Sequence, residues 1–462
     1  MHRLTDTPLA AASGFLDRPA VLTQDRTWTW GEVHGAAIAL AGRLPPGTTV
    51  CNLCDTRLGF LVTWLAALRR GCMQILPPSA GRSEMVEILK ASTRPVVVVD
   101  DAASESSWAD HALCFLHTPT PPPACQPDSG LTWLRDGDAE ALLVRLYTSG
   151  STGAPEPQTK TLGQLSRGAH VLAARLDEHV KGGVQAVAQI ICSVPPQHMF
   201  GLETSVMLPL VTGIPLRDCS PLLPADVQAA FAGAAAGAAW VATPLHLRAL
   251  ALSGVTLPGC RLVLTSTMPL SAALAAQAET LSGAPVMEIY GSTETGVVAM
   301  RRTAVEAVLR PVEGVHIEPL ETGTRVRGAH FSSPQTLADQ VEPDGGGGFV
   351  LLGRRGDLIK IGGRRASLMS LNRLLEDLPG LTDGVFYLPA STSGTQRLVL
   401  IHVGPALDHA ATRRWLRSRM DPLFLPRAII RVDRLPRTAA GKLPRAALDE
   451  LYAAHQSARE PR

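Results

Sequence analysis

A run of hydroxyl side chains and glycines follows a short apolar segment in the first half of the chain. The segment 141–146 has the pattern of a buried strand. The next residues, 147–155, read Tyr-Thr-Ser-Gly-Ser-Thr-Gly-Ala-Pro. In such a turn the backbone N–H groups and the hydroxyls can point outward together without a bulky Cβ between them, which suits phosphate binding. A solvent-exposed Ser/Gly hairpin loop is the alternative interpretation.

This run differs from the common phosphate loop, in which Gly-x-x-x-x-Gly-Lys-[Ser/Thr] opens a helix. It resembles the phosphate loop of the adenylate-forming superfamily: acyl- and aryl-CoA ligases, peptide-synthetase adenylation domains and luciferases. Their loop reads Tyr-Thr-Ser-Gly-[Ser/Thr]-Thr-Gly-x-Pro-Lys, and the match ends at Pro155 because Glu156 replaces the lysine. The resemblance makes Lys160 the candidate for the missing charge. It also implies that the ATP-binding residues of this loop are Thr148, Ser149, Gly150, Ser151, Thr152 and Gly153.

A second motif, 288–296, reads Glu-Ile-Tyr-Gly-Ser-Thr-Glu-Thr-Gly and has the pattern of a strand that ends in a turn. Phosphates repel a carboxylate unless a divalent cation lies between them, so Glu294 is predicted to be a Mg²⁺ ligand. In the family the tyrosine stacks on adenine, the first threonine contacts the α-phosphate and the glutamate holds the metal. The resemblance therefore implies an ATP site that contains Tyr290, Gly291, Thr293 and Glu294.

His198 and Asp339 are single residues whose predicted roles depend mainly on the resemblance. His198 follows an apolar strand, where the sites of open sheets lie, although a lone histidine is more often structural. The family places a histidine or an aromatic residue beside the substrate carboxylate at this point. Asp339 matches the family aspartate that binds the ribose hydroxyls. A carboxylate suits this diol because it accepts two charge-assisted hydrogen bonds.

The segment 353–365 resembles the hinge motif of the family. The resemblance implies that Arg354 contacts the ribose or a phosphate and that Gly356 is the hinge residue. Glycine suits a hinge because it adopts two backbone conformations readily. Gly362 and Gly363 correspond to the strand that reaches the tunnel for the thiol substrate.

Lys442 lies in the last motif, 436–445, which reads Pro-Arg-Thr-Ala-Ala-Gly-Lys-Leu-Pro-Arg. Read alone, a Gly-Lys pair in a loop is usually a surface turn. The segment resembles the family motif whose lysine bridges the carboxylate and the α-phosphate during adenylation. A cation on a loop can neutralise the charge that develops on phosphorus, so Lys442 is the expected catalytic cation.

The chain has 462 residues, 45% hydrophobic and 18% charged, which is the composition of a globular protein with a large core. Strand and helix patterns alternate, as in the helix expected at 271–281 and the strand at 285–290. The Ala-rich stretch 229–252 reads as a core helix and strand, too interrupted to span a membrane. We expect an α/β fold, with a large multilayer N-terminal domain (1–355) of mostly parallel sheets and a small, mobile α+β C-terminal lid domain (356–462).

The net charge of +2 gives no indication of nucleic-acid binding, but the charge is unevenly distributed. Residues 356–462 contain 17 Lys and Arg against 10 Asp and Glu, a net +7, which leaves −5 for the rest. This predicts an anionic partner for the C-terminal domain, with a solvated basic face as the alternative. Cys51 and Cys54 form the only C-x-x-C and are expected to be buried thiols. Scattered thiols and an N-terminus unlike a signal peptide favour a cytoplasmic location.

The five motifs occur in family order, and the resemblance implies ATP and Mg²⁺ as cofactors and two half-reactions. A carboxylic acid is first adenylated. The acyl group then passes to a thiol after the C-terminal domain rotates. The segments 149–165 and 358–368 are similar to ligases of aryl-polyene pigment clusters, which implies a 3- or 4-hydroxybenzoate-like acid and an acidic acyl carrier protein as partner. Candidates for the acid pocket are Trp240, Thr243, Ser266 and Met268.

Two other functions stay open. An aryl- or acyl-CoA ligase differs only in the thiol, and the phosphates of CoA also suit a basic C-terminal domain. A non-catalytic nucleotide-binding module is suggested by the departures from the family at Glu156 and Gly356. Retention of both Glu294 and Lys442 argues against that module, because a binding shell would not need both.

Overall fold

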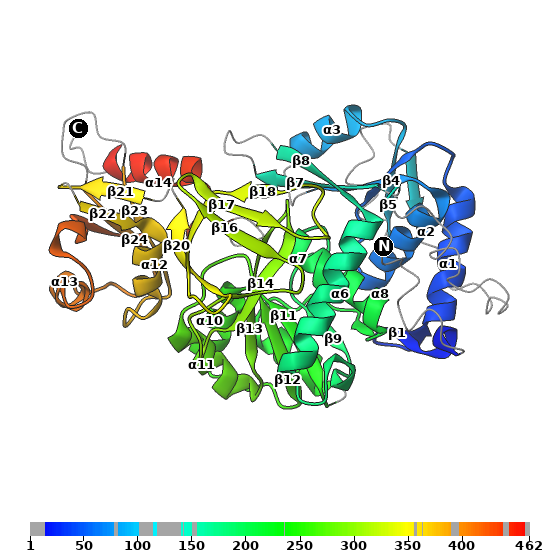
Figure 1. Cartoon of the computed structure of the whole chain (residues 1–462), viewed down its shortest axis with the longest axis horizontal. Helices are drawn as coiled ribbons and strands as arrows, with labels where there is room; N and C mark the ends of the chain where they lie inside the picture. The colour runs from blue at the N-terminus through cyan, green and yellow to red at the C-terminus, as the bar shows by residue number, and fades with distance from the viewer. Residues whose placement is uncertain are drawn as a thin grey trace.

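The computed structural model describes residues 14–77, 82–100, 114–117, 140–141, 143–149, 155–234, 236–354, 358–362, 364–389, 397–437 and 443–457. Two mixed sheets form the larger part of the molecule, and a smaller C-terminal unit lies at the opposite end from α1 and α2 (Figure 1).

The larger sheet has nine strands among the described residues. Its parallel strands are β1, β10, β9, β11, β12 and β13, in that order across the sheet. In spatial order the strands are β15 (Arg310–Pro311), β14 (Gly296–Arg302), β13 (Val286–Ser292), β12 (Cys260–Thr265), β11 (Ala238–Ala242), β9 (Ile190–Cys192), β10 (Leu216–Arg217), β1 (Pro19–Leu22) and β2 (Thr27–Thr29). Strands β2, β14 and β15 pair antiparallel with their neighbours. Because the central strands are parallel, their carboxyl ends meet along one edge, which is where ligands bind in such sheets.

The second sheet contains six strands in the described part of the chain: β6 (Cys114–His117), β5 (Pro95–Val99), β3 (Thr49–Asn52), β4 (Met73–Leu76), β7 (Leu143–Ser149) and β8 (Pro155–Thr161). It is parallel except for the pair β7 and β8. This antiparallel pair joins Ser149 to Pro155 in register and so brackets the predicted phosphate loop.

Helices and short helical turns cover these sheets. They are η2 (Phe15–Asp17), α1 (Trp30–Arg43), α2 (Arg57–Arg70), α3 (Arg82–Lys90), α6 (Leu162–His179), η5 (Val184–Ala186), α7 (Met199–Leu202), the π-helical turn η6 (Glu203–Met207), α8 (Leu208–Thr212), α9 (Pro224–Ala232), α10 (Pro244–Ser253) and α11 (Ala272–Ser282). Along β11 the side chains alternate between two hydrophobic clusters: Ala239 and Val241 join one, and Ala238 and Trp240 the other. Apolar packing on both faces is what a parallel sheet requires.

Local sequence signals explain several helix ends. Thr29 and Glu32 form a reciprocal capping box at the start of α1. Gly71 ends α2 in the left-handed conformation, with φ of 68°. The stretch 229–252 differs from expectation, because it contains a strand between two helices rather than one helix and one strand. Among the described residues, no helix combines the length and apolar character needed to cross a bilayer.

A three-stranded antiparallel sheet and a hairpin follow the large sheet in sequence. They contain β16 (His316–Leu320), β17 (Gly323–Arg327), β18 (Gln335–Leu337), β19 (Asp339–Pro343) and β20 (Phe349–Arg354). The C-terminal unit contains β21 (Leu358–Ile361), β22 (Arg364–Ser367), α12 (Leu368–Glu376), β23 (Asp383–Tyr387), β24 (Val399–Val403), α13 (His409–Arg417), η8 (Pro422–Phe424), β25 (Ala428–Arg431) and α14 (Arg445–Ser457).

The C-terminal unit has hydrophobic clusters of its own, formed by residues between 359 and 452, whereas the largest cluster ends at Phe349. The large α/β part and the smaller C-terminal domain confirm the expected fold class. The expected boundary between 355 and 356 lies outside the described residues and stays a prediction. Cys51 and Cys54 are buried thiols, as expected, and burial raises the pKa of Cys51 to about 12.

Candidate active site

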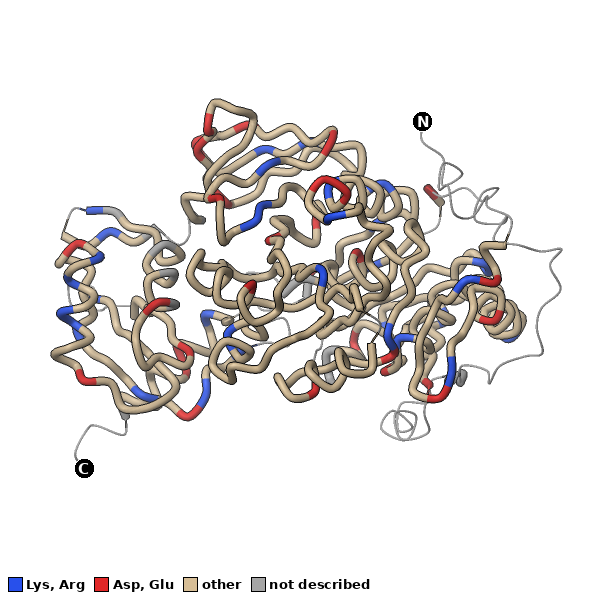
Figure 2. Tube along the Cα trace, turned by 90° about the horizontal axis from the view of Figure 1, so that it is seen from below, with Lys and Arg blue, Asp and Glu red and all other residues tan. Residues whose placement is uncertain are grey.

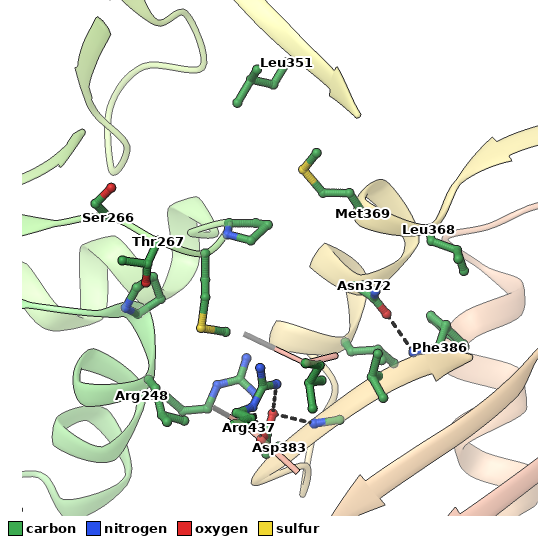
Figure 3. A pocket seen from close by; sticks show the side chains of 18 of the residues that line it. Arg248, Ser266, Thr267, Leu351, Leu368, Met369, Asn372, Asp383, Phe386 and Arg437 are labelled. Atoms are coloured by element: carbon green, nitrogen blue, oxygen red, sulfur yellow. Dashed lines mark hydrogen bonds and ion pairs between the residues drawn. The ribbon is translucent and has the colours of Figure 1, made fainter. Parts of the chain in front are cut away.

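A cleft of about 560 Å³ lies between the large α/β part and the C-terminal unit (Figure 3). One wall comes from the carboxyl ends of β12 and β13 and from β19, and it includes Ser266, Thr267, Met268, Tyr290, Gly291 and Asp339. The other wall comes from α12, β23 and the segments around α14, and it includes Met369, Asn372, Asp383, Phe386, Arg437 and Leu443. The edge of the sheet that parallel topology favours for ligands is therefore also the edge that the C-terminal unit covers.

The turn after β13 carries Thr293 and Glu294, both half-buried. Ser292 and Gly296 are paired across it as the last residues of an antiparallel hairpin. The N–H of Ser292 donates to Oγ1 of Thr295 at 3.1 Å, and the N–H of Thr295 donates to Oγ of Ser292 at 3.3 Å. A Cβ on Gly291 would lie 2.1 Å from the carbonyl oxygen of Gly296, so the two strands can approach only with glycine at this position.

Tyr290 and Asp339 line the same cleft although they are far apart in sequence. The ring of Tyr290 packs edge-on against Phe349, with ring centroids 5.7 Å apart. Asp339 opposes Arg354 in the register of β19 and β20, so the two residues predicted to contact the ribose are backbone neighbours. The structure thus brings together the Tyr290, Gly291 and Asp339 of the predicted adenosine site.

Lys160 lies beneath the turn, and its side chain is 3% exposed. Its Nζ donates to the backbone carbonyl of Glu294. Burial lowers the pKa of Lys160, while the carboxylates of Glu203 and Glu294 raise it. Lys160 is therefore joined to the metal-binding turn that was predicted from another motif.

The other predicted residues are placed less directly. His198 immediately precedes α7, beyond the carboxyl end of β9, and is not among the residues that line the cleft. Thr148 and Ser149 end β7. The predicted residues outside the described part are Gly150, Ser151, Thr152, Gly153, Gly356, Gly363 and Lys442, and the side chains of Thr148, Ser149 and Arg354 are not described either. Gly362 lies in the turn between β21 and β22, away from the cleft lining.

Ser266 and Met268 line the cleft as expected of acid-pocket residues, and Ser266 Oγ donates to the carbonyl oxygen of Ile289 at 2.8 Å. Trp240 instead lies in the core, 1% exposed, with its Nε1 donating to Ser193 Oγ at 2.9 Å. Thr243 caps α10 and is also absent from the cleft lining.

Sequence reasoning missed Thr267, which lines the cleft with φ of 83°, and the buried Glu203. A backbone conformation of this kind is costly for a β-branched residue. The sequence Thr-Ser-Thr-Met-Pro at and after the end of β12 gives no indication of this backbone conformation. Glu203 directly follows the His198 segment, and a lone acidic residue in an apolar run was the available signal.

The donor set fits ATP with Mg²⁺ rather than a protein-only metal site. Within the described ranges there is no cluster of three or more His, Cys, Asp or Glu side chains that could hold a metal. Mg²⁺ commonly keeps several waters and takes one or two carboxylates together with substrate phosphates. Glu294 alone, on a turn beside the cleft, suits that mode of binding.

Comparison with known proteins agrees with this geometry. Residues 9–328 match the family model "AMP-binding enzyme". The chain belongs to the AMP-binding enzyme family, the adenylate-forming superfamily expected from its motifs, whose members are acid–thiol ligases and adenylating enzymes that use ATP and Mg²⁺.

Among curated proteins, the chain is 27% identical to a 4-coumarate–CoA ligase of Cereibacter sphaeroides over 302 residues, 64% of this chain and 69% of that protein. It is 24% identical to the p-hydroxybenzoic acid–AMP ligase FadD22 of Mycobacterium tuberculosis over 490 residues, 95% of this chain and 67% of that protein. It spans 18% of the isonitrile lipopeptide synthase of Mycobacterium tuberculosis, so it matches only part of these relatives.

Among solved structures, the anthranilate CoA ligase AuaEII in complex with anthranoyl-AMP superposes with a TM-score of 0.81 at 17% identity, over 99% of this chain and 98% of that one. The o-succinylbenzoate CoA synthetase of Bacillus subtilis with ATP and magnesium gives a TM-score of 0.77 at 19% identity, over 93% and 96%. These likenesses confirm the fold.

The close approach at Gly291 gives the first prediction. In Gly291→Ala the new Cβ must displace the Gly296 carbonyl, which shifts Thr293 and Glu294. A misplacement of about 1 Å can lower the rate of a reaction between positioned groups roughly 100-fold. We expect the affinity for ATP·Mg²⁺, measured by calorimetry, to fall at least about tenfold. Gly42→Ala in α1 is the control, because its Cβ meets nothing within 4 Å. Unchanged binding by a folded Gly291→Ala protein would contradict the role of this turn.

Proposed function

We propose that the chain adenylates an aromatic carboxylic acid, similar to 3- or 4-hydroxybenzoate, and transfers the acyl group to the phosphopantetheine thiol of an acyl carrier protein. The observation that carries this proposal is the cleft. Tyr290 and Asp339 face Arg437 and Leu443 across it, and these two residues flank the segment that contains Lys442. An adenylation reaction needs a cation beside the α-phosphate, and Lys442 of this segment is the one we propose.

In the first half-reaction, a carboxylate oxygen of the acid attacks the α-phosphorus of ATP and pyrophosphate leaves. Negative charge develops on the α-phosphate oxygens, and fixed donors stabilise it most when water is excluded. Thr293, the hydroxyls and amides of 148–153, and Lys442 are the proposed donors. Mg²⁺, held by Glu294, would neutralise the leaving pyrophosphate. In the second half-reaction a thiolate attacks the acyl carbon and AMP leaves.

The cleft lining supports an aromatic acid. Met268, Pro269, Leu274, Ile289 and Leu351 give this wall an apolar surface, which suits a flat ring. Relatives named for aromatic acids, 4-coumarate and p-hydroxybenzoate, support the same substrate class.

The carrier protein is proposed from the charge of the C-terminal unit. Four arginines of α13 and the residues after it are exposed: Arg413, Arg414, Arg417 and Arg419. Blue segments recur along this unit in Figure 2. Acidic partners are steered to such a surface and held there at low salt. Transfer to CoA is the second candidate, favoured by the likeness to the 4-coumarate–CoA ligase.

The deciding experiment measures pyrophosphate release by the purified protein with ATP, Mg²⁺ and a panel of acids, run with holo-carrier protein, with CoA and with neither. Release with a hydroxybenzoate and an acyl mass on the carrier alone support the proposal. Acyl-CoA as the only product would replace the carrier by CoA. ATP binding without release for any acid would favour the non-catalytic module.

Lys442 is predicted to act in one half-reaction only. Lys442→Ala should lower pyrophosphate release about 100–1000-fold, the cost of losing one transition-state donor. Thioester formation from supplied acyl-adenylate should stay near the wild-type rate, because the thiol step does not use this cation. Lys90→Ala, an exposed lysine on α3, is the control. An equal loss in both half-reactions would refute the assignment.

The surface of α13 gives a further prediction. The double variant Arg414→Glu/Arg417→Glu should raise the KM for carrier protein about tenfold at low salt, and the difference should shrink as salt rises. Its adenylation rate should be unchanged. Lys181→Glu/Arg327→Glu makes the same charge change at exposed positions outside the C-terminal unit. If both double variants behave alike, α13 has no specific part in docking.

A further inference from the structure

Two buried side chains of opposite charge lie beneath the Thr293–Glu294 turn, outside the lining of the cleft. Lys160 comes from β8 and Glu203 from η6, and they are 3% and 4% exposed. Burying an ionisable group costs free energy, so two such groups under one turn are expected to have a physical role.

Each of the two side chains holds one side of the turn through the backbone. The ammonium of Lys160 donates to the carbonyl of Glu294. The N–H of Val297 donates to Oε1 of Glu203 at 3.1 Å. The carbonyl of Val297 is also bound, at 2.7 Å from Nε2 of His330. Groups from three distant segments therefore fix the backbone on which Glu294 is carried.

The space around Glu203 leaves its carboxylate little freedom. Gly296 adopts a φ of 69°, and a Cβ there would lie 2.5 Å from Oε1 of Glu203. A Cβ on Gly168 in α6 would lie 3.2 Å from the same oxygen. Two glycines thus make room for one carboxylate, and the fit restricts it to the position that receives the Val297 N–H.

Lys160 and Glu203 also interact electrostatically. The pKa of Glu203 is raised to about 7, because the effect of burial outweighs the lowering by the Val297 N–H and the Lys160 charge. Burial lowers the pKa of Lys160, and the Glu203 and Glu294 carboxylates raise it. Removing either partner leaves the other as an uncompensated charge beneath the turn.

We propose that Glu203 is a positioning residue for the ATP·Mg²⁺ site: with Lys160 it holds the Thr293–Glu294 turn against the triphosphate. Lys160 then acts through the carbonyl of Glu294 rather than through a phosphate contact of its own. This inference rests on the proposed function for the nature of the ligand, and it adds a residue that no motif of the chain predicted.

The test uses Glu203→Gln, Lys160→Met and the double variant. Glutamine keeps the shape and an oxygen for the Val297 N–H but lacks the charge, and methionine keeps the length of lysine without its donor. Binding of ATP and of AMP is measured by calorimetry with and without Mg²⁺. Thioester formation from supplied acyl-adenylate is measured separately.

Each single variant should weaken ATP·Mg²⁺ binding about tenfold or more. The double variant should lose less than the product of the two, because the effects of groups that interact electrostatically and hold one turn are not additive. AMP binding without Mg²⁺ and thioester formation should fall several-fold less than ATP·Mg²⁺ binding, since both keep the α-phosphate that Thr293 is expected to contact but neither uses the metal held by Glu294. Asp218→Asn is the matched control, because Asp218 is a carboxylate that accepts the Arg57 N–H at 2.7 Å and follows β10, which three strands separate from β13 in the large sheet.

Two outcomes would overturn the inference. One is unchanged ATP·Mg²⁺ binding by folded Glu203→Gln protein. The other is an equal loss of every readout, matching Asp218→Asn in thermal stability, which would leave Glu203 a purely structural residue. If Lys160→Met does not fold, Glu203→Gln decides alone. A wild-type protein that binds ATP·Mg²⁺ but releases no pyrophosphate would refute the proposed function and leave the binding test valid.

Discussion

The close contact between Gly291 and the backbone of Gly296 is the constraint on which the site depends. It lets β13 and β14 form a tight hairpin at the carboxyl end of the large sheet. The hairpin presents Tyr290 to the cleft and carries Thr293 and Glu294 on its turn. A side chain at Gly291 or Gly296 would open the turn. Glycine at these two positions is therefore needed to hold the polar residues between them in place.

Parallel topology supplies the rest of the arrangement. The carboxyl ends of β12 and β13 lie side by side because the strands run in the same direction, and Ser266 is bonded to the backbone of Ile289 across them. The large sheet and β19 form only one wall of the cleft. The C-terminal unit provides the other wall through β23 and the segments that flank α14. In that unit, the Arg437 guanidinium holds both carboxylate oxygens of Asp383 at 2.7 Å, which ties the start of the Lys442 segment to β23.

Features that are local in sequence can be predicted from motifs and caps. Thr29 and Glu32 mark the start of α1, Gly71 marks the end of α2, and the Tyr290–Glu294 motif marks the turn that the structure places beside the cleft. Features that depend on tertiary neighbours could not be predicted in this way. The Trp240 side chain is of a type that often lines ligand pockets. It lies in the core instead, because alternate residues of β11 face opposite sides of the sheet. Glu203 acquires its significance only from Lys160 and Val297, which are distant in sequence.

The register of β7 and β8 explains why Lys160 is not a simple replacement for the lysine that the phosphate loop lacks. Glu156, at the family position of that lysine, pairs with Thr148 and is exposed, whereas Lys160 pairs with Val144 and is buried. The two positions share one face of β8, but a strand rises about 3.3 Å per residue, so they lie about 13 Å apart. A cation at Lys160 therefore lies under the turn of β13 and β14 rather than beside Thr148. The positive charge of Lys160 thus lies at the backbone that carries Glu294, the predicted metal ligand, where Glu203 can compensate it.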